Sequence, residues 1–217
     1  MKKRNNSSKN IWDIENAFYL KSHQSRIIKT LSHYEIFKKS ISVKGSIVEC
    51  GVFKGASLSR FLTFRNYFSI KNKKAFGFDV FGAFPKQQFK NDNKFSKRHN
   101  KIAGLGSSPE IIKKHFKNKK FTNFQLIKGN IEKTIPKFLK NKRNFKISFL
   151  HLDLDVFQPT YYALNSFYKK VSSKGVILLD DHNSIEGATK AMNLFVKENK
   201  LKLNYLKNNK KLKFIIK

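Results

Sequence analysis

From residue 45 onward, the chain alternates short apolar runs with amphipathic segments of roughly 10 to 15 residues. This alternation is typical of βαβ units, in which helices connect parallel strands and cover the sheet. Five strands are predicted, at residues 46–50, 74–79, 122–127, 146–152 and 175–180. Five helices are predicted between and after them, at residues 55–68, 107–118, 132–140, 159–171 and 186–199. The pattern therefore predicts an α/β fold with a mostly parallel sheet.

The segments outside this alternation extend the prediction to the whole chain. Residues 1–10 are basic and polar and predict a disordered tail, and residues 11–44 predict an N-terminal cap of two helices. Residues 45–217 form the expected main domain, which ends in an antiparallel hairpin around Asn208 and Asn209. Residues 80–106 lack periodicity and predict a long loop, a kind of segment that is often functional.

Length and composition favour one folded domain. The chain has 217 residues, 40% of them hydrophobic, which is enough for a packed core. No apolar window of about 20 residues is free of Lys, Asp and Asn, so a transmembrane helix is not expected. Asp13 and Glu15 interrupt the apolar stretch that a signal peptide would need. The single cysteine, Cys50, fits a reducing compartment, and a cytoplasmic location is predicted.

Lysine dominates the charge of the chain. The formal net charge is +32, and only six of the 46 basic residues are arginine. Proteins that bind nucleic-acid phosphates favour the bidentate guanidinium, and the lysines here are spread along the whole sequence. Enrichment in Lys, Asn, Ile and Phe is also what an AT-rich coding sequence produces. A nucleic-acid partner is therefore disfavoured, whereas contact with an anionic membrane surface and association into a homo-oligomer are left open.

The acidic residues gather at the ends of the predicted strands. Six of the 14 acids lie at or just after the carboxyl end of a strand: Glu49, Asp79, Asp153, Asp155, Asp180 and Asp181. Ligands of open α/β sheets bind at this edge. A rim of carboxylates suits a cationic ligand and would repel a pyrophosphate. The sequence thus predicts a binding site for a cation-bearing ligand.

A glycine-containing turn follows the first predicted strand. Gly51 and Gly55 allow a tight turn and a close approach of a ligand to the backbone, and Glu49 stands at the head of the turn. Asp79 ends the next strand, where doubly wound folds place an acid that binds two ribose hydroxyls. Two alternatives remain open: a strand-to-helix turn without a ligand, and an Asp79 that caps the segment after it.

Four aspartates at two neighbouring strand ends predict a metal site. Two unit charges about 4 Å apart repel by about 4 kcal/mol at an effective dielectric of 20. Close packing of Asp153, Asp155, Asp180 and Asp181 therefore requires a cation, shared protons or lysine partners. Mg²⁺ commonly binds at such an all-oxygen site. The alternative is that Asp180, Asp181 or Asn183 caps the following helix while the other acids are solvated.

Five segments resemble one known family when they are taken in order. They are VECGVFKGAS, FGFDVFGAFP, GNIEKTIP, HLDLDVFQPTYYAL and GVILLDDHNSIEGATKAMNLF. Together they resemble the macrocin O-methyltransferase (TylF) family of class I S-adenosylmethionine-dependent methyltransferases, over about residues 45–200. The resemblance implies a Rossmann-like fold with a seven-stranded, mostly parallel sheet. It also implies Mg²⁺-dependent methylation of a hydroxyl, on a sugar or a secondary metabolite.

The resemblance assigns roles to individual residues. It implies a cofactor site formed by Glu49, Gly51, Gly55, Asp79 and Asn130. In that site Asp79 binds the cofactor ribose, and Asn130 lies at the adenine. The resemblance also implies a Mg²⁺ site formed by Asp153, Asp180 and Asp181. Asp155 then contacts the substrate or supports the metal ligands.

The general base and the acceptor are less well specified. His182 neighbours the metal-site acids and His99 lies in the predicted loop, and each titrates near neutrality, so both are candidate bases. His151 is expected to be a packed strand residue. His182 and Phe157 replace common tyrosines of the family, which leaves the substrate undetermined. The alternative functions are a nucleic-acid methyltransferase of the same fold and a binding protein that has lost its activity.

Overall fold

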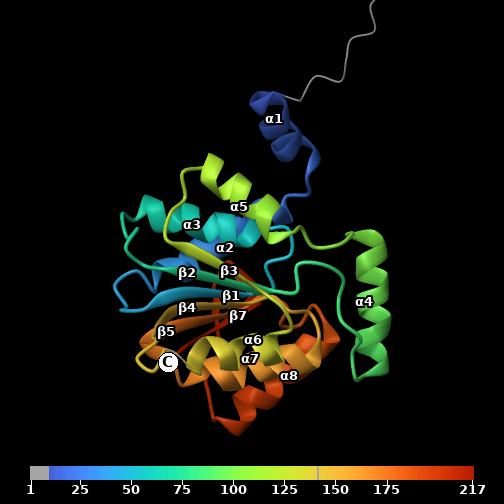
Figure 1. The fold of residues 1–217 in the computed structure, drawn as a ribbon, viewed down its shortest axis with the longest axis vertical. Coiled ribbons are helices and arrows are strands. Elements are labelled where there is room, and N and C mark those ends of the chain that lie inside the picture. The colour runs from blue at the N-terminus through green and yellow to red at the C-terminus, as the bar shows by residue number, and fades with distance from the viewer. Residues whose placement is uncertain (1–9, 141) are drawn as a thin grey trace, which may run out of the picture.

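The computed structural model describes residues 10–140 and 142–217, and within them the chain forms a sheet with helices on both faces (Figure 1). The strands are β1 (Ser46–Cys50), β2 (Ala75–Asp79), β3 (Phe124–Lys128), β4 (Ile147–Leu152), β5 (Val171–Leu179), β6 (Asn204–Leu206) and β7 (Asn209–Ile216). The helices are α1 (Ile11–Lys21), α2 (Ser25–Lys38), α3 (Ala56–Tyr67), α4 (Lys90–Ile102), α5 (Pro109–Asn118), α6 (Ile131–Lys140), α7 (Phe157–Tyr168) and α8 (Glu186–Glu198).

The sheet has seven strands in the order β3-β2-β1-β4-β5-β7-β6. The first five strands are parallel, and β7 pairs antiparallel with both β5 and β6. This arrangement confirms the predicted mostly parallel sheet with an antiparallel C-terminal hairpin. The strand order reverses between β1 and β4, and the crevice at such a switch point is where ligands bind in this class of fold.

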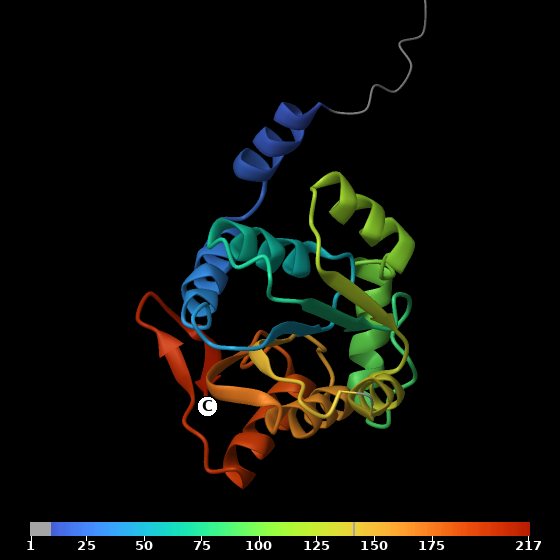
Figure 2. The ribbon, with the colours of Figure 1, turned by 60° about the vertical axis from the view of Figure 1, so that its left-hand side comes forward.

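Apolar residues on both faces of the strands build two cores. Ile47 and Phe149 belong to the core beneath α2, α3 and α5. Val48 and Leu150, one residue further along each strand, belong to the core beneath α6, α7 and α8. Because successive strand residues point to opposite faces, the near-continuous apolar runs fill both layers at once. Figure 2 shows the two helical layers with the sheet between them.

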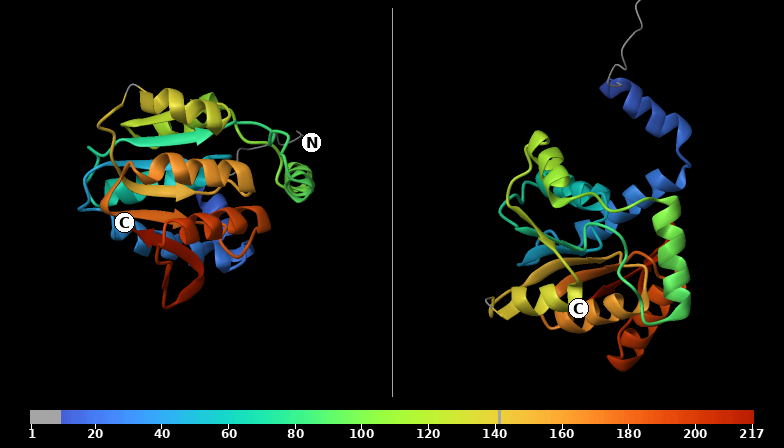
Figure 3. Two further views of the ribbon diagram at one scale, coloured as in Figure 1. Left: turned by 90° about the horizontal axis from the view of Figure 1, so that it is seen from below. Right: turned by 45° about the vertical axis from the view of Figure 1, so that its right-hand side comes forward.

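The two expected N-terminal helices are present but differ in packing. Helix α2 packs against α3 and the β5–β7 part of the sheet. Helix α1 has no buried residue, and it projects from the body in Figures 1 and 2 and in the right panel of Figure 3. The predicted basic tail lies almost wholly outside the described residues. None of the described helices is long and apolar enough to cross a membrane.

The prediction of one long loop over residues 80–106 is wrong, because α4 occupies residues 90–102. The face of α4 that packs inward is polar: Asp92 and Ser96 are buried one turn apart. An inward face of this kind gives no apolar periodicity, so the hydrophobic pattern of the sequence does not predict the helix. Figure 3 shows α4 standing at the side toward which the parallel strands point.

Candidate active site

The described residues enclose a cavity of about 480 Å³ at the carboxyl ends of the parallel strands. Its walls come from the turn after β1, the ends of β2, β3 and β4, and the facing sides of α2 and α3. Most of the sequence-predicted site residues line it: Gly51, Asp79, His99, Asn130, Asp153, Asp155 and Asp181. The cavity therefore lies at the topological switch point.

The turn after β1 is locked to its neighbouring strands. The Gly51 amide donates to the Phe78 carbonyl at 2.9 Å, and the Asp153 amide donates to the Cys50 carbonyl at 2.9 Å. Gly51 has φ +93°, and a Cβ built on it would lie 1.7 Å from the carbonyl oxygen of Asp153. Only glycine fits this position, because the conformation is left-handed and the neighbouring backbone leaves no room for a side chain.

Asp79 is held by the backbone around it. One carboxylate oxygen accepts the amides of Val52 at 2.7 Å and Phe53 at 2.8 Å, and the other accepts the amide of Phe81 at 2.6 Å. Asp79 therefore fixes the shape of the glycine turn and also begins the segment after β2. It lines the cavity, so remaining lone pairs of its oxygens face the space where a ribose was predicted.

The other predicted cofactor residues have separate positions. Asn130 lines the cavity, and its side-chain oxygen accepts the Glu132 amide at 2.8 Å at the start of α6. Gly55 has φ +87° and forms the N-cap of α3. Glu49 is fully buried and does not line the cavity, because its carboxylate faces His151 instead.

Three aspartates meet in the cavity. Asp153, Asp155 and Asp181 each offer an oxygen, and these oxygens lie within 4.8 Å of one another. Asp155 adopts a left-handed conformation at φ 65°, and its amide donates to the Asp181 carboxylate at 3.2 Å. Aspartate tolerates this conformation, and the bond to Asp181 helps to hold it.

Burial and mutual repulsion perturb these carboxyl groups. Burial, followed by the charges of Asp180 and Asp181, raises the pKa of Asp153 well above its usual range. Burial and Asp153 raise the pKa of Asp155 to about 7, and burial and Asp155 raise the pKa of Asp181 to about 8. A divalent cation would relieve this repulsion, and carboxylate oxygens are the donors that Mg²⁺ prefers. The three side chains thus fit a hard metal ion.

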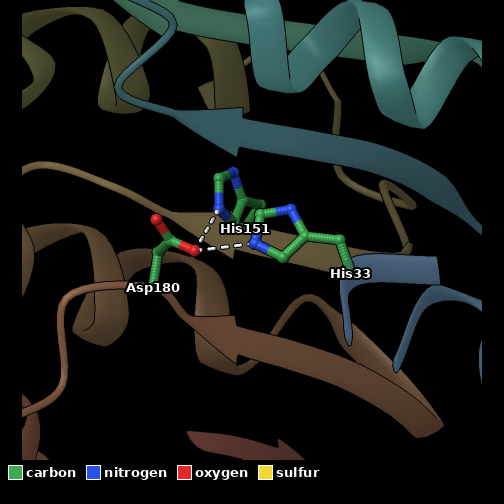
Figure 4. Close-up of side chains that lie close together, drawn as sticks. All are labelled: His33, His151 and Asp180. Carbon is green, nitrogen blue, oxygen red and sulfur yellow. Dashed lines mark hydrogen bonds and ion pairs between the residues drawn. The ribbon is translucent and has the colours of Figure 1, made fainter. Parts of the chain in front are cut away.

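Asp180 lies in a second, buried cluster next to the first. Its Oδ1 is 2.8 Å from Nε2 of His33 and 3.7 Å from Nε2 of His151 (Figure 4). His151 in turn places Nδ1 at 2.8 Å from Oε1 of Glu49, its direct partner across the β1–β4 register. The other oxygen of Asp180 is paired with the amino group of Lys29. Both oxygens of Asp180 are therefore occupied by basic groups.

The two histidines of this cluster carry different charges. Burial lowers the pKa of His33 to about 4 despite its contact with Asp180, so this ring is neutral. Arg60 donates to its Nδ1 at 3.0 Å, which leaves the proton on Nε2, facing Asp180. Burial also acts to lower the pKa of His151, but the carboxylates of Asp180 and Glu49 outweigh it and raise the pKa to about 10. His151 is therefore a buried cation.

The two candidate bases are not equivalent. His99 lines the cavity among the rings of Phe53, Phe84 and Phe95, and burial followed by the charge of Lys54 lowers its pKa. A neutral imidazole at the cavity wall can accept a proton. His182 does not line the cavity, and its Nε2 lies 2.8 Å from the side-chain oxygen of Asn193.

Sequence reasoning missed His33, Lys29 and Arg60, and it did not connect His151 with Glu49. The contact between Glu49 and His151 could have been inferred from the sequence. Both are polar residues near the ends of otherwise apolar strands, and these strands are neighbours in the sheet. The spacing in α2 is a second such feature, since positions 29 and 33 are one helical turn apart and share a face. Neither of these sequence features predicts that Arg60 of α3 contacts His33.

A model of the macrocin-O-methyltransferase (TylF) family matches residues 29–210. Among curated proteins, demethyldecarbamoylnovobiocin O-methyltransferase from Streptomyces niveus is 23% identical over 146 residues, which is 65% of this chain and 54% of the relative. The aligned part is thus about half the length of that relative.

Solved structures share the fold. The calicheamicin methyltransferase CalS11 has a TM-score of 0.74 at 19% identity, covering 97% of this chain and 87% of CalS11. A second CalS11 structure, of the apo form and described as a TDP-rhamnose 3′-O-methyltransferase, has a TM-score of 0.70 at 20% identity, covering 97% and 88%. The O-methyltransferase NovP has a TM-score of 0.76 at 18% identity, covering 88% of this chain and 80% of NovP. These likenesses confirm the predicted methyltransferase fold.

Proposed function

The chain belongs to the macrocin-O-methyltransferase (TylF) family, and from this premise we propose that it transfers the methyl group of S-adenosylmethionine to a hydroxyl of a sugar or a sugar-bearing secondary metabolite. One observation carries the proposal: a single cavity joins the glycine turn and Asp79 to the aspartates of the β4 and β5 ends. The structure described as a TDP-rhamnose 3′-O-methyltransferase and the relative named for demethyldecarbamoylnovobiocin support a sugar or sugar-bearing acceptor.

The cofactor half of the cavity lies over the first strands of the sheet. The left-handed backbone at Gly51 would let the turn approach the ligand closely, and Asp79 and Asn130, which line the cavity, would face the nucleoside. The acidic cavity favours the positive sulfonium over its neutral product. Asp79 acts here through its three backbone contacts as well, because they set the shape of the turn.

The acceptor half lies over β4 and β5. Asp153, Asp155 and Asp181 would hold Mg²⁺, whereas Asp180 is paired with His33 and Lys29. When bound, the ion supplies a positive charge that orients neighbouring acceptor oxygens and lowers the pKa of the reacting hydroxyl. The Asp153 carboxylate is positioned by the bond from its own amide to Cys50.

Methyl transfer forms an O–CH₃ bond, breaks the S–CH₃ bond and releases the hydroxyl proton. The chain must hold the acceptor oxygen in line with the methyl group and take up this proton. His99 suits the second task, because it is neutral, lines the cavity and has a buried Nδ1 without a partner among the described residues.

Two variants test whether the cavity has a cofactor half at Asp79 and a metal-binding acceptor half at Asp153. Asp79→Ala is expected to weaken S-adenosylmethionine binding about tenfold or more, because the glycine turn loses three hydrogen bonds. Asp153→Asn is expected to keep that affinity within about twofold and to abolish the Mg²⁺-dependent rise in melting temperature. Calorimetric titration of the cofactor and thermal melting with and without Mg²⁺ measure both effects. The reverse pattern would overturn the assignment.

Activity itself is tested with isotopically methyl-labelled cofactor. Cell extracts incubated with the protein and labelled S-adenosylmethionine are expected to yield labelled products by mass spectrometry, and fewer of them with Asp153→Asn or without Mg²⁺. Cofactor binding without any transfer would instead indicate a binding protein that has lost its activity.

The cellular setting stays a prediction. The buried single cysteine is compatible with the proposed cytoplasmic location. Self-association is proposed through α1, whose large apolar side chains lie exposed: Ile11, Trp12, Ile14, Phe18, Tyr19 and Leu20. Light scattering of the wild type and of Trp12→Ser with Leu20→Ser measures it, and equal monomer masses for both would refute it.

A further inference from the structure

The acceptor half of the cavity carries basic groups that the proposed chemistry does not use. Arg26 and Lys29 come from one face of α2, and Arg60 comes from α3. Lys29 is paired with Asp180 beyond the end of β5, and Arg60 contacts His33, which contacts the same aspartate. Lys29 and Arg60 are therefore linked, directly or through His33, to the aspartate that follows β5.

The two arginines stand out against the composition of the chain. Only six of 46 basic residues are arginine, and two of those six line this one cavity from different helices. Where lysine is the default cation, arginine marks positions that need a planar, bidentate donor. Arg65 follows the same logic, since its buried guanidinium donates to the carbonyls of Thr122, Asn123 and Lys73.

Neither cavity arginine has an acid as its own partner. In residues 10–140 and 142–217, no carboxylate oxygen lies within ion-pair distance of Arg26 or Arg60. Arg60 is partly buried and donates one N–H to the neutral ring of His33. Its remaining donors, and those of the exposed Arg26, are available to a ligand in the cavity.

The acids that face these arginines have another task under the proposed function. Asp153, Asp155 and Asp181 would be neutralised by the divalent ion and the sulfonium. With those cations in place, the guanidiniums of Arg26 and Arg60 are positive charges without a counterion, and an anion on the acceptor would compensate them.

We propose that Arg26 and Arg60 form an anion subsite for the acceptor, and that the sugar methylated by this chain carries a phosphate or diphosphate group. The inference rests on the proposed function and adds the substrate class to it. Two guanidiniums from separate helices can bind different phosphoryl oxygens. The hydroxyl to be methylated then lies between this subsite and the aspartates.

The test is calorimetric titration of the full chain, saturated with S-adenosylhomocysteine and Mg²⁺, at 0.15 M salt to suppress unspecific binding. The probes are thymidine diphosphate and uridine diphosphate, with methyl glucoside as the neutral probe and glucuronate as the carboxylate probe. Wild type is expected to bind at least one diphosphate and neither of the other probes. R26A and R60A are each expected to weaken diphosphate binding about tenfold or more.

Two further variants separate a subsite from simple charge effects. R98A removes an equal charge from the exposed face of α4, outside the cavity, and is expected to leave diphosphate affinity unchanged. R60K keeps the charge at the subsite but loses the bidentate fork, and is expected to weaken binding as R60A does. Because Arg26 is exposed, R26A is expected to leave the stability of the fold unchanged.

The outcomes distinguish this inference from the proposed function. If S-adenosylhomocysteine binds and no diphosphate binds, or if R26A and R60A bind diphosphates as the wild type does, the anion subsite is wrong while the proposed function stands. Binding of glucuronate without any diphosphate also overturns it. If S-adenosylhomocysteine itself does not bind the wild type, the proposed function fails first.

Discussion

Gly51 sets the distance between the turn after β1, which we propose binds the cofactor, and Asp153, a proposed metal ligand. Its amide is bonded to β2, and its missing side chain leaves room for the carbonyl of Asp153. Gly51→Ala would place Cβ 1.7 Å from that oxygen at φ +93°. The backbone cannot yield locally, so we expect a loss of about 3 kcal/mol or more in the free energy of unfolding.

Gly82→Ala is the matched control, because a Cβ there meets no atom within 4 Å. Its free energy of unfolding is expected to stay within about 0.5 kcal/mol of the wild type. Urea unfolding compares the three proteins. A tolerated Gly51→Ala would mean that the turn can move away from Asp153, and the division of the cavity would then need revision.

The buried ionisable groups predict a stability that falls with pH between about 6.5 and 8. The folded-state pKa values of Asp155, Asp181 and His151 are raised to about 7, about 8 and about 10. In this window the folded chain holds more protons than the unfolded chain, whose carboxyl groups are ionised and whose histidines lose their protons. The free energy of unfolding therefore decreases as pH rises.

Below about pH 6.5 the groups have opposite effects on the free energy of unfolding. The pKa of His33 is lowered to about 4, so its contribution to stability increases as pH rises, against that of the aspartates. Thermal melting at pH 6.5 and 8, in chelator and in Mg²⁺, measures the effect. Mg²⁺ is expected to raise the melting temperature more at pH 8, where the free acids are ionised. A metal effect that is equal at both pH values would contradict the assigned site.

The residue scale also shows how far the sequence can predict the site. Asp153 and Asp181 could be placed because parallel strands end at one edge, so consecutive strand-end acids must meet. The orientation of Asp180 could not, because His33 arrives from a helix about 150 residues earlier in the chain. A strand pattern gives position along the sheet edge, whereas the direction of a side chain depends on its tertiary partners.

Elements with an apolar inward face were predicted well, and α4 was not. The predicted helix at 107–118 has Ile112 and Phe116 buried one turn apart, which periodicity detects. In α4 the corresponding positions are Asp92 and Ser96, whose polar groups are satisfied inside the fold. Binary patterning cannot find a helix that is held by hydrogen bonds instead of by apolar burial.

Asp92 is the residue that docks α4. Its carboxylate accepts the Phe157 amide at 2.9 Å, at the first residue of α7, and its other oxygen lies beside Gly187 of α8. Asp92→Ala leaves this amide without a partner, so we expect a loss of about 1–2 kcal/mol in the free energy of unfolding. Faster hydrogen exchange over residues 90–102 should accompany it.

Lys94→Ala, an exposed change in the same helix, is the control and should alter neither quantity. Because His99, the proposed base, lies in α4 and lines the cavity, loosening α4 should also lower kcat/KM for the acceptor. Unchanged exchange rates in Asp92→Ala would show that other contacts dock the helix.

At the scale of the whole molecule, most of the positive charge has no partner. The chain carries 46 basic and 14 acidic residues. Among the described residues, four of the five close ion pairs belong to the buried Asp180 and Glu49 cluster, and only Lys190–Glu186 is exposed. The surface lysines therefore repel one another, which destabilises the compact state.

Salt should consequently stabilise this protein. The Debye length falls from about 30 Å at 0.01 M to about 3 Å at 1 M salt, so NaCl screens the repulsion between surface lysines. We expect the melting temperature to rise with NaCl at pH 7, by about 2–4 °C for each kcal/mol of repulsion removed. The slope should shrink at pH 10.5, near the ordinary lysine pKa of about 10.4, because fewer lysines then carry charge. A slope that is the same at both pH values would assign the effect to salt acting on apolar burial, and a melting temperature that falls with NaCl would show that the lysines are paired.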